Sequence, residues 1–156
     1  MHEAEQYELM SDLDCIPRLK GLAEVWNMLL LLIMESAGCS LEEAILEEQQ
    51  RASRKLPSLW GGVGVRHGAM KALKTMHAKG LVHGDMKLDN IMFDIGTGQV
   101  KLIDFGLTKL EGRAKQRREV ECLNELLLEA EKRAAKQVAE YKGATFVWGT
   151  SKLHVH

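Results

Sequence analysis

The chain has 156 residues, a length that allows one domain of ordinary size. Apolar residues make up 46% and charged residues 28%, so the chain can bury a hydrophobic core. The formal net charge of −1 gives no global reason to expect binding to nucleic acid or to a membrane. The acidic start at residues 1–5 is unlike a signal peptide, and the longest apolar run, residues 28–34, is too short to span a bilayer.

The three cysteines, Cys15, Cys39 and Cys122, are odd in number and show no CxxC spacing. This pattern favours free thiols over disulfides or a zinc site. Free thiols are typical of a reducing compartment, so we expect a cytoplasmic protein.

The first third of the chain predicts a short helix followed by two strands. Tyr7, Met10 and Leu13 lie three residues apart among glutamates, which predicts a helix over residues 3–13. Two strands are expected within residues 22–34. The second of them is a continuous apolar run, which indicates a strand buried on both faces.

Two further helices are predicted before the middle of the chain. Ser40, followed three residues later by Glu43, is typical of a capping box, so a helix should run from residue 40 to about residue 55. The glycine-rich residues 61–64 predict a loop. A longer helix is expected over residues 65–79, with a glycine directly after it as a stop signal.

A β-hairpin is predicted in the second half of the chain. The apolar residues 91–93 and the extended pattern of residues 100–103 flank a segment rich in turn formers, residues 94–99. Asn90 and Asp104 lie at the ends of the two arms. The hairpin should therefore bring these two polar side chains close together.

A long helix is predicted after the hairpin, over residues 115–141. Its apolar residues recur at helical spacing, which is typical of a helix packed along one side. This stripe consists of Val120, Leu123, Leu127, Ala130, Ala134 and Val138. The tail at residues 146–148 is expected either to form one last strand or to dock.

The most specific part of the sequence is residues 81–106, LVHGDMKLDNIMFDIGTGQVKLIDFG. Its notable polar positions are His83, Asp85, Lys87, Asn90 and the triplet Asp104-Phe105-Gly106. A lone Asp-Phe-Gly is more often part of a surface hairpin with solvated carboxylates, but the joint match is far more specific. The stretch resembles the catalytic loop and metal-binding turn of the protein-kinase-like superfamily.

The resemblance implies a role for each of these side chains. Asp85 would orient the attacking hydroxyl, and Lys87 would meet the γ-phosphate of ATP as a point charge. Asn90 and Asp104 would hold Mg²⁺, a hard cation that prefers oxygen ligands. His83 occupies the position at which such loops use a histidine to brace the backbone.

The resemblance also implies an adenine-binding hinge. Met34 resembles the gatekeeper residue, and Glu35 to Ala37 resemble the hinge whose backbone binds adenine. Met92 would form the apolar floor under the adenine. Ordinary core packing is an equally good interpretation of the two methionines.

The sequence departs from the family pattern at the phosphate-binding side. Glu3 falls where helix C carries a glutamate that pairs with a strand lysine, with Glu5 as the less favoured choice, but no such lysine precedes it. A Gly-rich phosphate loop is also missing. Gly62-Val63-Gly64 lies between two predicted helices rather than two strands, so we interpret it as a helix connector.

The catalytic loop and the segment after it depart as well. Gly84 replaces the arginine that usually precedes the catalytic aspartate, which argues against the usual control by phosphorylation. His-Gly-Asp is also found in aminoglycoside and choline kinase-like phosphotransferases, whereas Lys87 is the choice of protein kinases. No Ala-Pro-Glu follows, and the basic residues between 113 and 118 fit a solvated helix start better than a substrate or phosphate contact.

The expected fold is α+β and mostly helical, with a single domain over residues 1–156. It should resemble the C-terminal lobe of a kinase with helix C and the hinge strands, over about residues 3–110, with most of the N-terminal lobe missing. The implied function is ATP- and Mg²⁺-dependent phosphoryl transfer to a hydroxyl of a protein or small molecule. The alternative is a non-catalytic (pseudokinase) binding or scaffold module, favoured by the missing lysine and Gly-rich loop.

Overall fold

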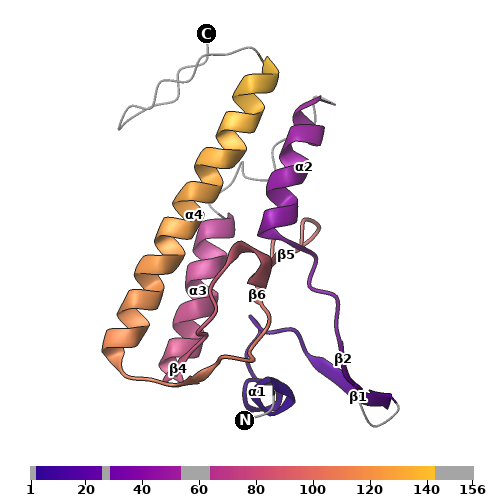
Figure 1. Cartoon of the computed structure of the whole chain (residues 1–156), viewed down its shortest axis with the longest axis vertical. Coiled ribbons are helices and arrows are strands. Elements are labelled where there is room, and N and C mark those ends of the chain that lie inside the picture. Colours follow the sequence, from indigo (N-terminus) through magenta and orange to yellow (C-terminus); the bar gives the residue numbers. More distant parts are fainter. Residues whose placement is uncertain (1–2, 26–28, 54–63, 143–156) are drawn as a thin grey trace.

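The structure is a computed structural model that describes residues 3–25, 29–53 and 64–142. Within these ranges the chain forms four α-helices and three small antiparallel sheets (Figure 1). The mixture agrees with the α+β class expected from the sequence. The predicted tail element at residues 146–148 and most of the predicted loop at residues 61–64 lie outside the described residues.

The N-terminal part contains helix α1 (Glu3–Leu9) and the antiparallel strands β1 (Leu19–Val25) and β2 (Leu29–Met34). The helix is shorter than predicted, because the chain turns at Met10, whose carbonyl accepts a hydrogen bond from Leu13 N at 2.9 Å. The first strand begins three residues earlier than predicted, at Leu19. The hairpin of β1 and β2 extends away from the helices (Figure 1). Leu31 and Ile33 are 44% and 50% exposed, so the prediction that the second strand is buried on both faces is wrong.

Helix α2 (Leu41–Ser53) begins at the predicted capping box. Ser40 Oγ accepts a hydrogen bond from Glu43 N at 3.2 Å, and a carboxylate oxygen of Glu43 accepts one from Ser40 N at 2.9 Å. The two bonds satisfy backbone donors that a helix start otherwise leaves free. The sequence prediction of this helix start is confirmed.

Helix α3 (Gly64–Ala78) and the predicted hairpin follow. Strands β5 (Ile91–Phe93) and β6 (Val100–Leu102) pair antiparallel, and β3 (Cys39–Ser40) adds to the outer edge of β5. The hairpin is therefore confirmed. A second small sheet joins two short strands on either side of it in the chain, β4 (Leu81–Val82) and β7 (Lys109–Leu110).

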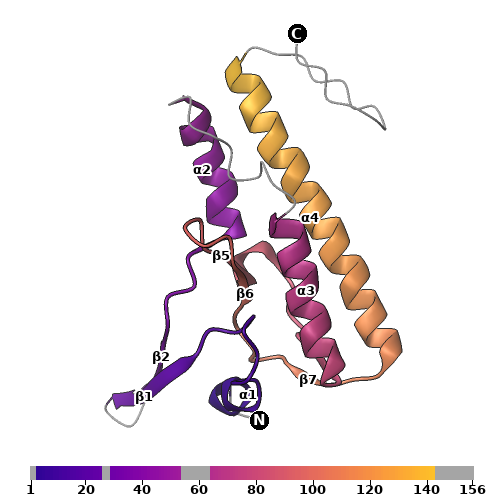
Figure 2. The ribbon, with the colours of Figure 1, turned by 180° about the vertical axis from the view of Figure 1, so that it is seen from behind.

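Helix α4 (Arg113–Lys142) runs alongside α2 and α3 (Figure 2). Its bounds lie within two residues of the prediction. Arg66 of α3 forms an ion pair with Glu131 of α4, with Nε and Oε1 3.0 Å apart, and Arg133 pairs with Glu42 of α2. Both pairs join partly exposed side chains on α4 to its two neighbouring helices. None of the described helices is long and apolar enough to cross a membrane.

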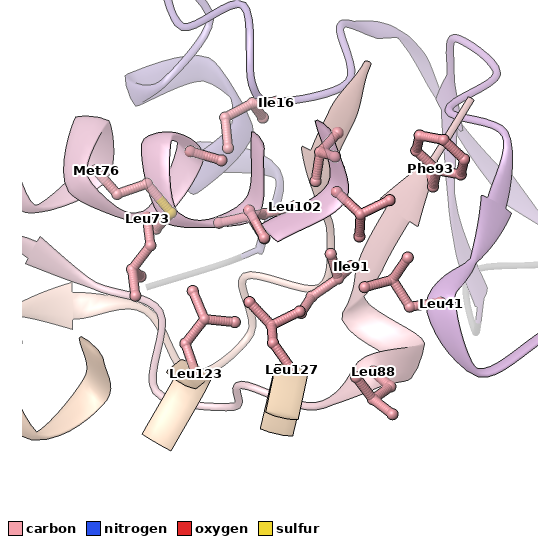
Figure 3. Packing of buried hydrophobic residues seen from close by; sticks show 14 of the residues in the cluster. Ile16, Leu41, Leu73, Met76, Leu88, Ile91, Phe93, Leu102, Leu123 and Leu127 are labelled. Carbon is pink, nitrogen blue, oxygen red and sulfur yellow. The ribbon is translucent and has the colours of Figure 1, made fainter. Parts of the chain in front are cut away.

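One hydrophobic core lies between the three long helices and the hairpin of β5 and β6 (Figure 3). The stripe predicted on the last helix faces it, with Leu123, Leu127 and Ala130 fully buried. The residues labelled in the close-up are Ile16, Leu41, Leu73, Met76, Leu88, Ile91, Phe93, Leu102, Leu123 and Leu127. The core holds β5 and β6, and with them the two loops that carry the polar motif, against α3 and α4.

A glycine in α3 tests how closely the helix packs on the hairpin. A Cβ at Gly68 would lie 2.6 Å from Val100 Cγ2 and 2.9 Å from Val100 Cβ. Replacing glycine by alanine inside a helix normally stabilises the helix by about 1 kcal/mol. At Gly68, however, the added methyl group would overpack the contact with Val100. We therefore expect Gly68→Ala to lower the free energy of unfolding by about 1–3 kcal/mol. Chemical denaturation measures this change.

Gly64, at the start of the same helix, is the matched control, because no atom of the described residues lies within 4 Å of a Cβ placed there. Gly64→Ala should leave stability unchanged or raise it slightly. The double variant Gly68→Ala/Val100→Ala should recover part of the loss. A Gly68→Ala protein as stable as the unmodified chain would show that α3 and β6 do not approach as described.

Candidate active site

The loop between β4 and β5 carries the first two candidate residues. Lys87 Nζ lies 2.7 Å from Asp85 Oδ2 and 3.8 Å from Asp104 Oδ2. One ammonium group therefore stands between two carboxylates that are far apart in sequence. The hydrogen bond from Lys87 lowers the pKa of Asp85 below its usual value, and the same bond raises the pKa of Lys87. Both groups are consequently ionised at neutral pH.

Asn90 is held under this pair at the end of a short 3₁₀ turn, η1 (Leu88–Asn90). Its side chain is almost fully buried, and its Nδ2 donates hydrogen bonds to Asp85 O at 2.8 Å and to Asp85 Oδ2 at 3.1 Å. In both hydrogen bonds that the Asn90 side chain makes to described residues, the amide nitrogen is the donor. The amide oxygen stays available as a metal ligand.

The hairpin brings Asp104 next to Asn90. Ile91 and Leu102 are cross-strand partners, and Ile103 N continues the ladder by donating to Asn90 O at 3.1 Å. Asp104 follows with a φ of 66°, a left-handed conformation that aspartate tolerates better than most residues. This backbone conformation re-aims the side chain at the point where the strand ends.

A cluster of three rings in edge-to-face and tilted contact lies behind Asp104. Phe105 is fully buried between Tyr7 of α1 and His83, with ring centroids 4.9 Å and 5.2 Å away. Tyr7 Oη accepts a hydrogen bond from Asp104 N at 3.3 Å, and burial raises the pKa of Tyr7 to about 12. The ring cluster ties α1 to the Asp104 turn.

His83 braces the catalytic loop from inside the core, as the resemblance implied. Its Nε2 lies 2.9 Å from Ile103 O, and its Nδ1 accepts a hydrogen bond from Asp85 N at 3.3 Å. Since a carbonyl can only accept, Nε2 carries the proton and Nδ1 does not. Burial lowers the pKa of His83, so the ring is neutral and its tautomer is fixed by these two bonds.

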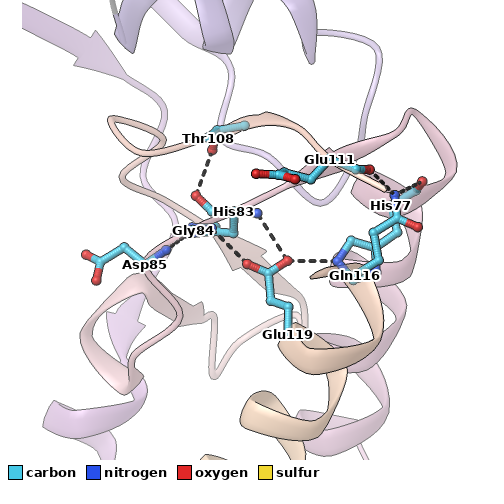
Figure 4. Close-up of polar contacts among 8 residues, drawn as sticks. All are labelled: His77, His83, Gly84, Asp85, Thr108, Glu111, Gln116 and Glu119. Atoms are coloured by element: carbon cyan, nitrogen blue, oxygen red, sulfur yellow. Dashed lines mark hydrogen bonds and ion pairs between the residues drawn. The ribbon is translucent and has the colours of Figure 1, made fainter. Parts of the chain in front are cut away.

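Glu119 of α4 holds the backbone just before Asp85 (Figure 4). Its Oε1 accepts a hydrogen bond from Gly84 N at 2.8 Å, and its Oε2 accepts bonds from His83 N at 3.1 Å and His77 Nε2 at 2.7 Å. Burial alone would raise the pKa of Glu119, but the three hydrogen bonds together hold it below its usual value. One buried carboxylate therefore satisfies two loop amides and orients a histidine.

The sequence analysis did not identify Glu119 as a site residue. The sequence does contain an indication of this role. Glu119, Leu123 and Leu127 are spaced four residues apart, which places the glutamate on the core-facing side of the helix. A charged residue at such a position needs partners, since burying an unpaired carboxylate is costly. Which partners it finds depends on tertiary packing.

Gly84, which replaces the usual arginine, is required by this geometry. Its φ is +86°, and a Cβ there would lie 2.5 Å from Leu107 O. Only glycine combines that conformation with so close an approach of another backbone. The loop is thus clamped between the Glu119 carboxylate and the segment after Phe105.

The proposed hinge residues lie beside the hairpin. Lys101, the cross-strand partner of Met92, forms an ion pair with Glu35. Cys39 and Ser40 pair with Phe93 and Met92, so the end of this linker lies on the edge of β5. Met34 packs on the core, and Ala37 is partly buried in the same linker. Glu35 thus reaches the hairpin at Lys101, opposite Met92, and the shared adenine-binding role of these residues stays a prediction.

The donor set suits Mg²⁺ better than a softer metal. No group of three or more His, Cys, Asp or Glu side chains gathers in the described part of the chain. Asn90 and Asp104 offer an amide oxygen and a carboxylate, and Mg²⁺ typically takes one or two carboxylates, keeps several waters and binds substrate phosphates. These residues thus fit Mg²⁺ together with a nucleotide.

Comparisons with known proteins agree with this geometry. The family model described as "Protein kinase domain" matches residues 3–129, which extends beyond the expected 3–110 into α4. NUAK family SNF1-like kinase 2 of Homo sapiens is 30% identical over 118 residues, 74% of this chain and 18% of that protein. Serine/threonine-protein kinase pim-2 of Danio rerio is 49% identical over 37 residues, 24% of this chain and 12% of that protein.

Among solved structures, the Cydia pomonella granulovirus kinase PK-1 aligns with a TM-score of 0.51 and 23% sequence identity. The alignment covers 70% of this chain and 39% of the viral chain, and it shows a shared fold. The chain thus spans a minor part of each of these relatives. Because the family model covers most of the chain, including both loops of the site, the chain belongs to the protein kinase family.

Proposed function

We propose that the chain takes part in ATP-dependent phosphoryl transfer to a hydroxyl acceptor. The observation that carries this proposal is the meeting of Asp85, Lys87, Asn90 and Asp104 at the ends of β4, β5 and β6. Phosphoryl transfer depends mainly on positioning and on neutralising charge, rather than on covalent chemistry by the protein. The cluster offers a carboxylate for the acceptor, a cation for phosphate and two oxygen ligands.

Asp85 would orient the acceptor hydroxyl, and its lowered pKa keeps it ionised and able to accept that hydrogen bond. Lys87 would neutralise charge on the transferred phosphoryl group. Asn90 and Asp104 would hold Mg²⁺, which would supply further charge neutralisation. Adenine would lie along the hinge at Met34, Glu35 and Ala37, over Met92.

A non-catalytic binding module is the second candidate. Glu3, which falls where helix C carries its lysine-binding glutamate, forms no ion pair with any described residue. Glu3 therefore takes no part, within the described residues, in the lysine clamp that holds phosphates in kinases. Such a chain would bind nucleotide weakly, or bind a partner, without turnover.

Nucleotide binding tests the metal site. Without the lysine clamp we expect Mg-ATP to bind with a Kd no tighter than about 0.1–1 mM, equivalent to about 4–5.5 kcal/mol. Asp104→Ala should abolish Mg²⁺-dependent binding, because it removes the carboxylate ligand. Titration calorimetry with and without EDTA measures both. Micromolar affinity would show that another segment replaces the clamp, and unchanged binding in Asp104→Ala would place the metal elsewhere.

Catalysis tests the role of Asp85. Loss of phosphate positioning raises the barrier, with each ~1.4 kcal/mol worth tenfold in rate, so we expect turnover far below the ~1–100 s⁻¹ typical of kinases. Asp85→Asn, which keeps the shape but removes the charge, should reduce transfer from radiolabelled ATP to background. Activity that survives this substitution would indicate contamination or another mechanism. Complete inactivity of the unmodified chain that still binds nucleotide would support the binding module.

Glu119→Gln tests the anchor of the loop. An amide presents only one acceptor oxygen to three donors, so at least one buried donor loses its partner, at a cost of about 1–3 kcal/mol in unfolding free energy. The matched control is Glu121→Gln, an exposed neighbour on the same helix, which should change stability by no more than about 0.5 kcal/mol. Chemical denaturation measures both variants.

The pH dependence gives a second readout for Glu119. Its folded-state pKa lies below the unfolded value of about 4.3, so its stabilisation is full above that pH and is lost as pH falls through the folded pKa. The stability difference between the unmodified chain and Glu119→Gln should therefore shrink in acid. A difference that grows in acid would contradict the low folded-state pKa.

A further inference from the structure

The edge of β2 that faces away from β1 is unpaired within the described part of the chain. The two strands form a two-stranded sheet, and their hairpin extends away from the helices (Figure 1). A two-stranded hairpin is at best marginally stable by itself, whereas three or more strands with an apolar face form a stable sheet. A free edge also presents a row of backbone N–H and C=O groups that can pair with another strand.

The outer edge of β1 is protected against such pairing. The register with β2 shifts between Leu19 and Gly21, so Lys20 is an extra residue in a β-bulge. Lys20 and Glu24 also place exposed charges on this strand. Bulges and charged side chains are means by which natural proteins keep an edge strand from pairing with another chain.

Strand β2 lacks these protective features. Its sequence, LLLLIM, contains neither a charged residue nor a proline, and its register with β1 is regular from Leu29 to Ile33. An uncharged, regular strand with a free edge is the kind that recruits a further strand. The hairpin therefore has one protected edge, on β1, and one edge that is open to pairing, on β2.

One face of the open strand is apolar and exposed. Leu31 and Ile33 are exposed, and they share a face because side chains alternate along a strand. Their cross-strand partners, Ala23 and Gly21, offer no large side chain to cover them. Leu32, on the opposite face, packs on the core. An added strand would therefore pair with the free backbone groups and cover exposed aliphatic side chains at the same time.

A second copy of β2 complements this strand without burying a charge. In an antiparallel pairing about a two-fold axis at Leu32, Leu31 lies opposite Ile33 of the partner subunit, and Ile33 lies opposite the partner's Leu31. Two aliphatic cross-strand pairs then form on the exposed face, and such pairs stabilise a sheet. A contact of this kind uses the same surface on both copies and closes into a two-fold dimer.

We propose that two copies of this chain pair through residues 30–34 of their β2 strands into a four-stranded antiparallel sheet of order β1-β2-β2-β1. Assembly ends at two copies, because the strands at both outer edges of this sheet are the protected β1 strands. The expected product is therefore a dimer rather than a fibre. The inference concerns assembly and does not depend on the proposed phosphotransferase function.

A lipid surface fits the exposed face less well than a second copy does. Hydrocarbon can cover Leu31 and Ile33, but it cannot form hydrogen bonds with the free backbone groups of β2. The charges of Lys20 and Glu24 lie on the neighbouring strand of the same hairpin. A second copy satisfies the backbone groups as well as the side chains.

Sedimentation velocity of the whole chain over a range of concentrations tests the proposal. The buffer contains a reducing agent, because Cys122 is exposed and can form an intermolecular disulfide. We expect an equilibrium between monomer and dimer without larger species. Hydrogen exchange should show added protection of β2 amides at high concentration, and no added protection of the β1 amides that face away from β2.

Matched variants locate the interface. Leu31→Lys/Ile33→Lys places like charges opposite each other in the two-fold register, so it should raise the dissociation constant of the dimer at least about tenfold. The control, Leu9→Lys/Leu128→Lys, changes two exposed leucines on α1 and α4 and should leave the constant unchanged. Circular dichroism checks that each variant is folded.

Charge exchange separates lost pairing from misfolding. Leu31→Glu/Ile33→Glu should also weaken the dimer, whereas its equimolar mixture with Leu31→Lys/Ile33→Lys should form a heterodimer, since opposite charges then face each other. A heterodimer no tighter than either variant alone, a chain that stays monomeric up to its solubility limit, growth of larger polymers, or equal dimerisation of Leu31→Lys/Ile33→Lys and the unmodified chain would overturn the proposal. A monomeric chain that binds phosphatidylcholine vesicles, with binding lost in Leu31→Lys/Ile33→Lys, would overturn it in favour of a lipid surface.

Discussion

The geometry of the site depends on one buried carboxylate, that of Glu119. It accepts hydrogen bonds from Gly84 N and His83 N and so fixes the backbone from which Asp85 projects. The carboxylate can do this because α4 packs its apolar stripe on the core and carries Glu119 on the same side. Burial would be costly for a charge without partners, but the two amides and His77 supply three donors. The packing of α4 is thereby coupled to the position of the catalytic loop.

A second constraint fixes the turn at Asp104. Asp104 has a left-handed backbone, which costs on the order of 1–3 kcal/mol and persists only where its surroundings impose it. The surroundings do so from both sides. Ile103 is bonded to Asn90 through the hairpin, Phe105 is buried between Tyr7 and His83, and Tyr7 Oη accepts the Asp104 amide hydrogen. Helix α1 therefore supplies none of the proposed ligands. It contributes to the site through the aromatic ring and the hydroxyl of Tyr7.

The parts of the fold governed by local rules were predictable from the sequence. The capping box at Ser40 and the hairpin that ends at Asp104 follow from side chains near in sequence, and both are confirmed. The two-residue strands β3, β4 and β7 could not be predicted, because such pairings exist only once the core places their backbones side by side. The same holds for the role of Glu119: its position on the apolar stripe is visible in the sequence, whereas its partners are set by tertiary packing.

On the proposed function, the ion pair between Lys87 and Asp85 holds the site in a resting arrangement. The ammonium that should meet a phosphate is instead bonded to the carboxylate that should meet a hydroxyl, at 2.7 Å. A nucleotide that binds at Asn90 and Asp104 would compete for Lys87, since phosphate is a strong acceptor. Departure of Lys87 would remove the main cause of the lowered pKa of Asp85. The carboxylate would keep its hydrogen bond from Asn90 but lose its ion pair and become more basic as the phosphate arrives, which couples occupation of the donor side to readiness of the acceptor side.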